Sequence, residues 1–124
     1  MQKVFGFSKA KRLNTPSDFR AVFKNPLRSG SPCFTVLASP NGREVSRLGV
    51  VVAKRYIRLA VTRNWIKRKI RENFRLYQDK LLGLDIVVLV RCTTIELKRA
   101  SNLTEILCQQ WAEIGKKWKN VCAG

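Results

Sequence analysis

The sequence contains no histidine, and its eight aspartate and glutamate residues are scattered along the chain. Histidine is the side chain that most readily transfers protons at neutral pH, and it is also the commonest metal ligand. None of the carboxylates stands in a recognisable metal-binding motif. The sequence therefore predicts neither a catalytic residue nor a metal site within the protein itself.

A long apolar segment is also missing. The longest near-continuous apolar run covers residues 86–90, far short of the roughly 20 residues that a membrane-spanning helix needs. The apolar patch at residues 4–7 is too short for the core of a secretory signal. We therefore expect a cytoplasmic protein that has no membrane partner.

Closely spaced cysteines are absent as well. The four cysteines stand far apart, at Cys33, Cys92, Cys108 and Cys122. Zinc sites usually place two cysteines a few residues apart and often add histidine, so this spacing argues against zinc. Two disulfides would be possible in a secreted protein, whereas in the cytoplasm we expect free thiols in the core or on the surface.

Positive charge is what the chain has in excess. It carries 25 lysines and arginines against 8 acidic residues, a formal charge of +17 over 124 residues, and its sequence pI is near 10.7. Such a chain repels itself, and this charge is typical of proteins that bind a polyanion. The length and the 45% of hydrophobic residues fit one domain over residues 1–124, with residues 1–14 as a loosely held basic arm.

The first helix has a clear start. Thr15 is a good N-cap, Pro16 suits the first helical position, and Asp18 adds a carboxylate three residues after the cap. Apolar residues then recur at the spacing of one helical face, at Phe19, Val22 and Phe23. We predict a short helix that ends at residues 25–26.

Three segments have the character of strands. Residues 33–39 follow a turn-rich stretch at 28–32 and precede a turn at 40–42. Residues 47–53 are rich in β-branched side chains and suit a strand buried on both faces. We predict that these two strands form an antiparallel pair, and that residues 85–92 form another buried strand.

Two longer segments are amphipathic helices by their apolar spacing. The first covers residues 60–82 and is closed by Gly83, and the second runs from 103 to about 119, with lysines near its end. The predicted fold class is α+β, a single small domain with a central sheet and about three helices.

The densest charge of the chain lies at residues 54–75, where nine basic residues accompany a single acid, Glu72. At about 100° per residue, one arc of the helix of roughly 100° holds Asn64, Lys67, Arg68, Arg71 and Arg75. Most charged helix faces are merely solvated. This one lacks the interleaved glutamates that would relieve repulsion, and arginine, which suits phosphates and base edges, predominates. The pattern favours RNA or DNA binding.

The stretch KRYIRLAVTRNWIKRKIRENF at residues 54–74 resembles the signature of the protein component of bacterial ribonuclease P. Its core reads Arg-Asn-x-x-Lys-Arg-x-x-Arg-Glu on a helix. The early Phe19 and Phe23, the strand residue Gly49 and the order of elements also fit. The resemblance covers nearly the whole chain.

The resemblance implies an unusual fold and two RNA-binding surfaces. The basic helix would lie in a left-handed βαβ crossover, although right-handed crossovers are the physical default. The surface for the catalytic RNA would contain the motif residues with their basic neighbours, namely Arg58, Arg63, Asn64, Lys67, Arg68, Arg71 and Arg75. A cleft for the 5′ leader of precursor tRNA would contain Phe19, Phe23 and Lys54, since aromatic rings stack on unpaired bases. Plain core packing remains the alternative for both phenylalanines.

One position departs from the pattern of the family, which usually reads Arg-Asn-Arg. Trp65 stands where the second arginine is expected. On the helical wheel it lies away from the apolar arc, so it is not an obvious core residue. Stacking on a base, contact with the C-terminal helix and neutral variation all remain open.

The resemblance further implies a protein subunit that assists RNA-catalysed removal of the 5′ leader from precursor tRNA. The Mg²⁺ ions would be held by RNA phosphates rather than by a protein site, and no obligate protein partner is expected. A general basic or ribosome-associated RNA-binding protein is the main alternative. An autonomous nuclease and a protein that reads the DNA major groove are further ones.

Overall fold

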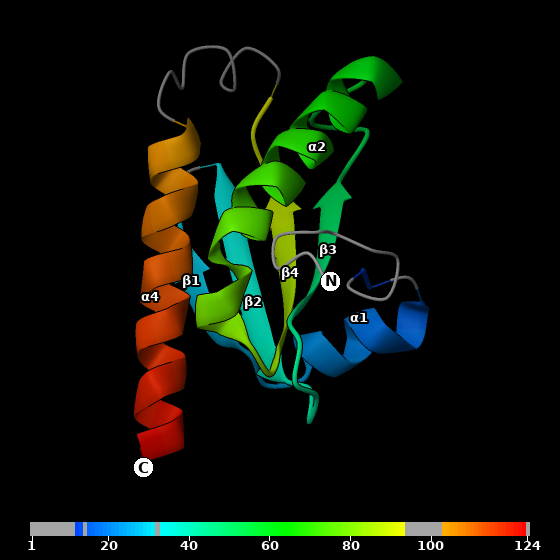
Figure 1. Ribbon diagram of the computed structural model, residues 1–124. Helices are drawn as coiled ribbons and strands as arrows, with labels where there is room; N and C mark the ends of the chain where they lie inside the picture. The colour runs from blue at the N-terminus through cyan, green and yellow to red at the C-terminus, as the bar shows by residue number, and fades with distance from the viewer. Residues whose placement is uncertain (1–11, 14, 32, 94–102, 124) are drawn as a thin grey trace, which may run out of the picture.

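The computed structural model describes residues 12–13, 15–31, 33–93 and 103–123, which form an α+β domain (Figure 1). The elements in chain order are α1 (Pro16–Phe23), β1 (Leu27–Gly30), β2 (Phe34–Pro40), β3 (Arg47–Val52), α2 (Ala60–Tyr77), the 3₁₀ helix η2 (Gln78–Leu81), β4 (Leu84–Val90) and α4 (Leu103–Ala123). The three predicted helices and three predicted strands are present. The strand β1 is an addition, because residues 28–32 were expected to be a turn.

The four strands are arranged in the order β1-β2-β4-β3. β2 is antiparallel to both β1 and β4, whereas β3 is parallel to β4. The predicted antiparallel pairing of 33–39 with 47–53 is therefore wrong. β4 is almost entirely buried. An apolar strand buried on both faces favours the interior of a sheet, and β4 lies there between β2 and β3.

β3 is consequently an edge strand. Only Leu48 and Gly49 of its six residues are buried, and Val51 is 37% exposed, so the prediction that this strand is buried on both faces is wrong. The chain leaves β3, passes along α2 and returns through β4. Figure 1 shows α2 in front of the sheet and β4 to the left of the upward-pointing β3, which makes the crossover left-handed, as the resemblance implied.

Helices cover both faces of the sheet. α2 and α4 pack on one face and α1 on the other, so the buried side chains form two clusters. In the larger cluster Trp111 of α4 stands edge-on to Phe74 of α2, with ring centroids 5.5 Å apart. Its indole N–H donates to Oδ1 of Asn73 at 2.6 Å. These contacts fix α2, and with it the basic face, against α4.

Residues 1–11 and 14 of the predicted basic arm lie outside the described residues. The two arm residues that are described belong to the fold. Leu13 is buried, and its backbone N–H donates to the carbonyl of Leu48 in β3 at 3.0 Å. Arg12 forms a parallel β-bridge with Leu48. The arm thus ends as a structured segment beside β3.

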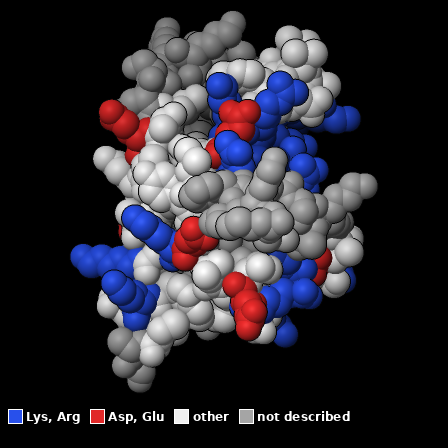
Figure 2. Space-filling view, in the orientation of Figure 1, with Lys and Arg blue, Asp and Glu red and all other residues white. Residues whose placement is uncertain are grey.

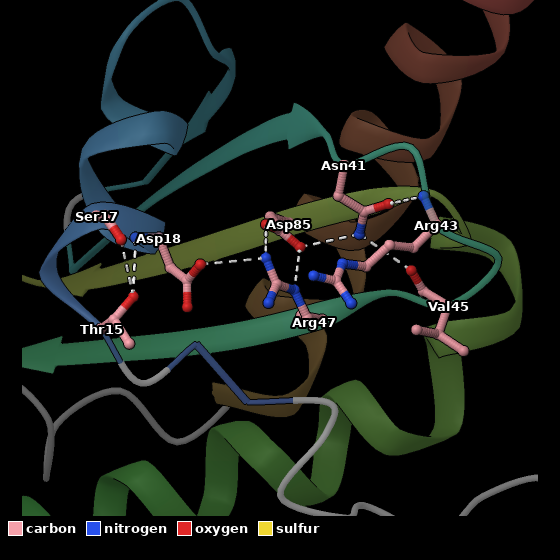
Figure 3. A network of polar contacts seen from close by, with 8 residues as sticks. All are labelled: Thr15, Ser17, Asp18, Asn41, Arg43, Val45, Arg47 and Asp85. Atoms are coloured by element: carbon pink, nitrogen blue, oxygen red, sulfur yellow. Dashed lines mark hydrogen bonds and ion pairs between the residues drawn. The ribbon is translucent and has the colours of Figure 1, made fainter.

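A polar network joins α1 to the sheet (Figure 3). Arg47 of β3 donates to both carboxylate oxygens of Asp85 in β4, at 2.8 and 2.5 Å, and it lies 3.5 Å from the carboxylate of Asp18 in α1. Asn41 donates to Asp85 at 2.9 Å. The Asp85 hydrogen bond raises the pKa of Arg47 above its usual value. Thr15 caps α1 by accepting from the N–H of Asp18, as its sequence predicted.

Candidate RNA-binding surface

The basic face of α2 forms one wall of an open groove of about 390 Å³. Four residues predicted for the surface that binds the catalytic RNA line it, namely Asn64, Arg68, Arg71 and Arg75, and Arg12 and Glu72 complete it. The view in Figure 2 shows lysine and arginine gathered in the upper right, over the upper part of α2. The structure therefore brings these motif side chains to one site.

Arg71 is the groove residue most affected by the other cations. Partial burial lowers the pKa of its guanidinium, and the nearby charge of Arg12 lowers it further. Two cations held this close repel each other, and an anion placed between them would relieve the repulsion. A phosphate suits this arrangement because guanidinium groups bind it in a planar, bidentate manner.

Arg63 occupies a different position from the groove residues. Its guanidinium donates to the backbone carbonyls of Ile57 and Arg58, at 2.9 and 2.8 Å. These bonds hold the loop between β3 and α2 against the first turn of the helix, which has no side-chain N-cap. Arg63 therefore shapes the approach to the groove, and the side chain of Arg58 is exposed beside it.

The remaining motif positions lie along the same helix. Lys67 is half-buried and does not line the groove. Trp65 is 43% exposed, as expected for a residue outside the apolar arc, and the Lys69 ammonium lies 6.0 Å from its ring centroid. An exposed indole next to cations is able to stack on a base.

The two phenylalanines of the predicted leader cleft have different surroundings. Phe19 is half-buried and packs over Gly49 of β3, where a Cβ atom would lie 2.7 Å from two atoms of its ring. Phe23 is 46% exposed. It lines an open hollow of about 560 Å³ on α1 together with Ser17, Arg20, Ala21 and Lys24.

Lys54 is exposed beyond the end of β3. It lies five residues along the chain from Gly49, or roughly 16 Å if that segment is extended. Of the three residues predicted for the leader cleft, only Phe23 lines the hollow on α1.

Three of the described carboxylates form ion pairs with arginine or lysine. Asp18 and Asp85 bind Arg47, and Glu113 accepts from Ser29 and pairs with Lys117. Among the described residues, no group of three or more acidic or cysteine side chains could hold a metal ion. The cysteines are all free thiols: Cys33 and Cys92 are buried, Cys108 is half-buried and Cys122 is exposed.

No helix in the described part of the chain is long and apolar enough to cross a membrane.

Arg12 is the groove residue that sequence reasoning missed. Its position comes from the β-bridge with Leu48, a contact between segments far apart in the sequence. The only local signal was the alternation of basic and apolar residues that made residues 1–14 look like a basic arm.

Comparison with known proteins identifies the family. The family model for Ribonuclease P matches residues 7–114. The RNase P protein of Staphylococcus aureus is 30% identical, with 90% of this chain and 97% of that chain covered and a TM-score of 0.67. A mutant of that protein with defective mRNA degradation activity gives 30% identity, 90% coverage of both chains and a TM-score of 0.68.

The RNase P protein of Thermotoga maritima is 31% identical, with 86% of this chain and 96% of that chain covered and a TM-score of 0.65. The match thus extends over most of the fold and includes the basic helix with its groove. This chain belongs to the ribonuclease P protein family.

Proposed function

We propose that this chain is the RNA-binding protein subunit of a ribonuclease P ribonucleoprotein, in which an RNA performs the cleavage. The observation that carries the proposal is the groove on α2, where Arg12, Arg68, Arg71 and Arg75 converge beside Asn64. A groove of this charge binds phosphates of structured RNA. Its partner is the catalytic RNA.

The second surface binds the 5′ leader of precursor tRNA beside α1. Phe23 presents an exposed ring between Arg20 and Lys24, which combines base stacking with phosphate contacts. Phe19 supports this surface by packing on Gly49, and Lys54 binds the strand further along. The protein thereby holds the substrate while the RNA carries out the reaction.

Metal ions needed by the reaction belong to the RNA in this proposal. Asp18, Asp85 and Glu113 are paired with arginine or lysine, and Glu72 lines the groove together with four arginines. Such surroundings repel Mg²⁺ unless phosphates are present. RNA phosphates supply the oxygen ligands that Mg²⁺ prefers, and the protein contributes by reducing repulsion between the two RNAs.

The main alternative is a general basic RNA-binding protein, and substrate preference separates the two. Fluorescence anisotropy would measure the affinity of the assembled protein and catalytic RNA for precursor tRNA with and without its 5′ leader. The proposal predicts tighter binding of the substrate that has a leader, only when the protein is present. Equal affinity for both substrates would favour the alternative.

A further inference from the structure

A second hollow lies on the other side of α2 from the groove. It has a volume of about 690 Å³, within the range of roughly 300–1,000 Å³ that is typical of small-molecule sites. Its walls are the end of α2 with η2 and the C-terminal half of α4. Tyr77 and Arg75 are separated by about 200° on the helix, so this hollow and the groove face different directions.

Aromatic side chains form part of the wall. The Trp118 indole N–H donates to the carbonyl of Leu82 at 3.0 Å, which fixes the ring while leaving it partly exposed. Tyr77 is also partly exposed, and the Lys80 ammonium lies 5.8 Å from its ring centroid. The hollow therefore offers two partly exposed rings close to a cation, and the ring of Trp118 is fixed by its hydrogen bond.

Unpaired lysines surround these rings. Lys80, Lys116 and Lys119 line the hollow, and none of them forms an ion pair with an acidic residue of the described chain. The adjacent Lys117 differs, because it pairs with Glu113 at 3.4 Å and donates to the carbonyl of Arg28. Figure 2 shows a separate group of basic side chains in the lower left of the view, apart from those over the upper part of α2.

Gly115 keeps the hollow open. A Cβ atom at this position would meet only Leu81 and the carbonyl of Lys80, both at 3.7 Å, which is ordinary contact. Close packing therefore does not require glycine here, and glycine inside a helix weakens it. The absent side chain leaves space between η2 and α4.

We propose that this hollow binds an unpaired nucleotide of RNA. The base lies against the rings of Trp118 and Tyr77, and the flanking phosphates contact Lys80, Lys116 and Lys119. Stacking on aromatic rings beside cations is the general chemistry of single-strand binding. The site is additional to the two surfaces of the proposed function and does not depend on the leader or on the catalytic RNA.

Nuclear magnetic resonance of the full chain provides the test, because each of the three tryptophans gives its own indole N–H signal. The probe is a uridine tetranucleotide, compared with an abasic tetramer of the same charge. The uridine probe is expected to shift the Trp118 signal in a saturable manner, and the abasic probe to shift it far more weakly. No shift at Trp118, or equal shifts with both probes, would overturn the proposal.

Three variants sharpen the result. Gly115→Met fills the hollow without changing the charge and should abolish the Trp118 response. The double variant Lys116→Gln/Lys119→Gln, at two exposed positions, should weaken the affinity read at Trp118 by about fivefold or more. Lys117→Gln is the matched control, expected to change the affinity less than about twofold. If the Trp118 signal responded to the uridine probe as in the unmodified chain in both Gly115→Met and Lys116→Gln/Lys119→Gln, the result would contradict the proposed site.

Cleavage of precursor tRNA is a separate readout. Loss of the Trp118 response in Gly115→Met with normal reconstitution supports the site as an additional contact. Failure of the nucleotide to bind leaves the proposed function of the groove and of α1 intact.

Discussion

Gly49 permits the close approach of α1 to the sheet. The Phe19 ring lies so near its backbone that an added Cβ atom would stand 2.7 Å from the ring. We predict that Gly49→Ala lowers the free energy of unfolding by about 1–3 kcal/mol through overpacking, measured by urea denaturation. Gly30→Ala is the control, since nothing lies within 4 Å of its added Cβ. Equal losses in both variants would contradict this explanation.

Alanine substitutions at Phe23 and Phe19 should distinguish an effect on stability from an effect on leader binding. Because Phe23 is 46% exposed, Phe23→Ala should change the free energy of unfolding by less than about 0.5 kcal/mol. Affinity for leader-bearing substrate should fall by about 1–3 kcal/mol through lost stacking, and affinity for leaderless substrate should not change. Anisotropy titrations with both substrates measure the difference.

The half-buried Phe19 provides the comparison for Phe23. Phe19→Ala should cost about 2 kcal/mol of stability, less than a fully buried phenylalanine. If Phe23→Ala weakened the binding of leader-bearing and leaderless substrate equally, the exposed ring would have no role in recognising the leader.

At the scale of elements, the groove on α2 depends on Arg71 at its centre. Arg71→Ala should weaken assembly with the catalytic RNA and reduce the salt slope of binding by about one unit. The fold should survive, because the substitution removes repulsion from Arg12. Filter binding over a range of salt concentrations measures the slope. Arg43→Ala, outside the groove, is the control. An equal effect in this variant would mean that binding depends on overall charge and not on the groove.

The link between α1 and the sheet depends on Arg47. Its side chain is 12% exposed and that of Asp85 is 8% exposed, so removing one partner leaves a nearly buried charge. We predict that Arg47→Ala lowers the free energy of unfolding by about 3 kcal/mol. Thermal and urea denaturation measure the loss, with Arg43→Ala from the neighbouring loop as the control. A loss below that of the control would contradict the role of the network in Figure 3.

Helices were easier to predict from this sequence than strand pairing. Thr15 and Pro16 mark the start of α1, and the apolar spacing of residues 66–81 marks α2, because these signals are local. The turn at residues 40–42 suggested a hairpin, yet β4, which follows α2, lies between β2 and β3. The insertion depends on contacts between distant segments, and β1 was missed because Arg28, Ser29 and Gly30 have weak strand propensity.

The candidate site shows the same difference between local and long-range signals. The α2 side of the groove follows from helical periodicity, so Asn64, Arg68, Arg71 and Arg75 were found. Arg12 was not, since its place depends on pairing with β3. The hydrogen bonds from Arg63 to the carbonyls of Ile57 and Arg58 could not be predicted either. In the sequence, an arginine that holds a loop cannot be distinguished from one that contacts RNA.

At the scale of the molecule, the chain has a formal charge of +17, and its described basic side chains lie on separate surfaces rather than in a single patch. Affinity for RNA should therefore fall steeply with salt, at roughly 0.7–0.9 in logarithmic slope for each phosphate contacted. The surfaces lie on different sides of one small domain, and the proposed function assigns a different RNA to the groove and to the surface beside α1.

The most direct measurement is the cleavage of precursor tRNA at low Mg²⁺ by the purified protein alone, by a bacterial ribonuclease P RNA alone, and by the two together. The proposal predicts no cleavage by the protein, slow cleavage by the RNA, and rapid release of the mature 5′ end by the mixture, with the gain reduced by Arg71→Ala. Cleavage by nuclease-free protein without RNA, or a mixture no faster than the RNA alone, would contradict it.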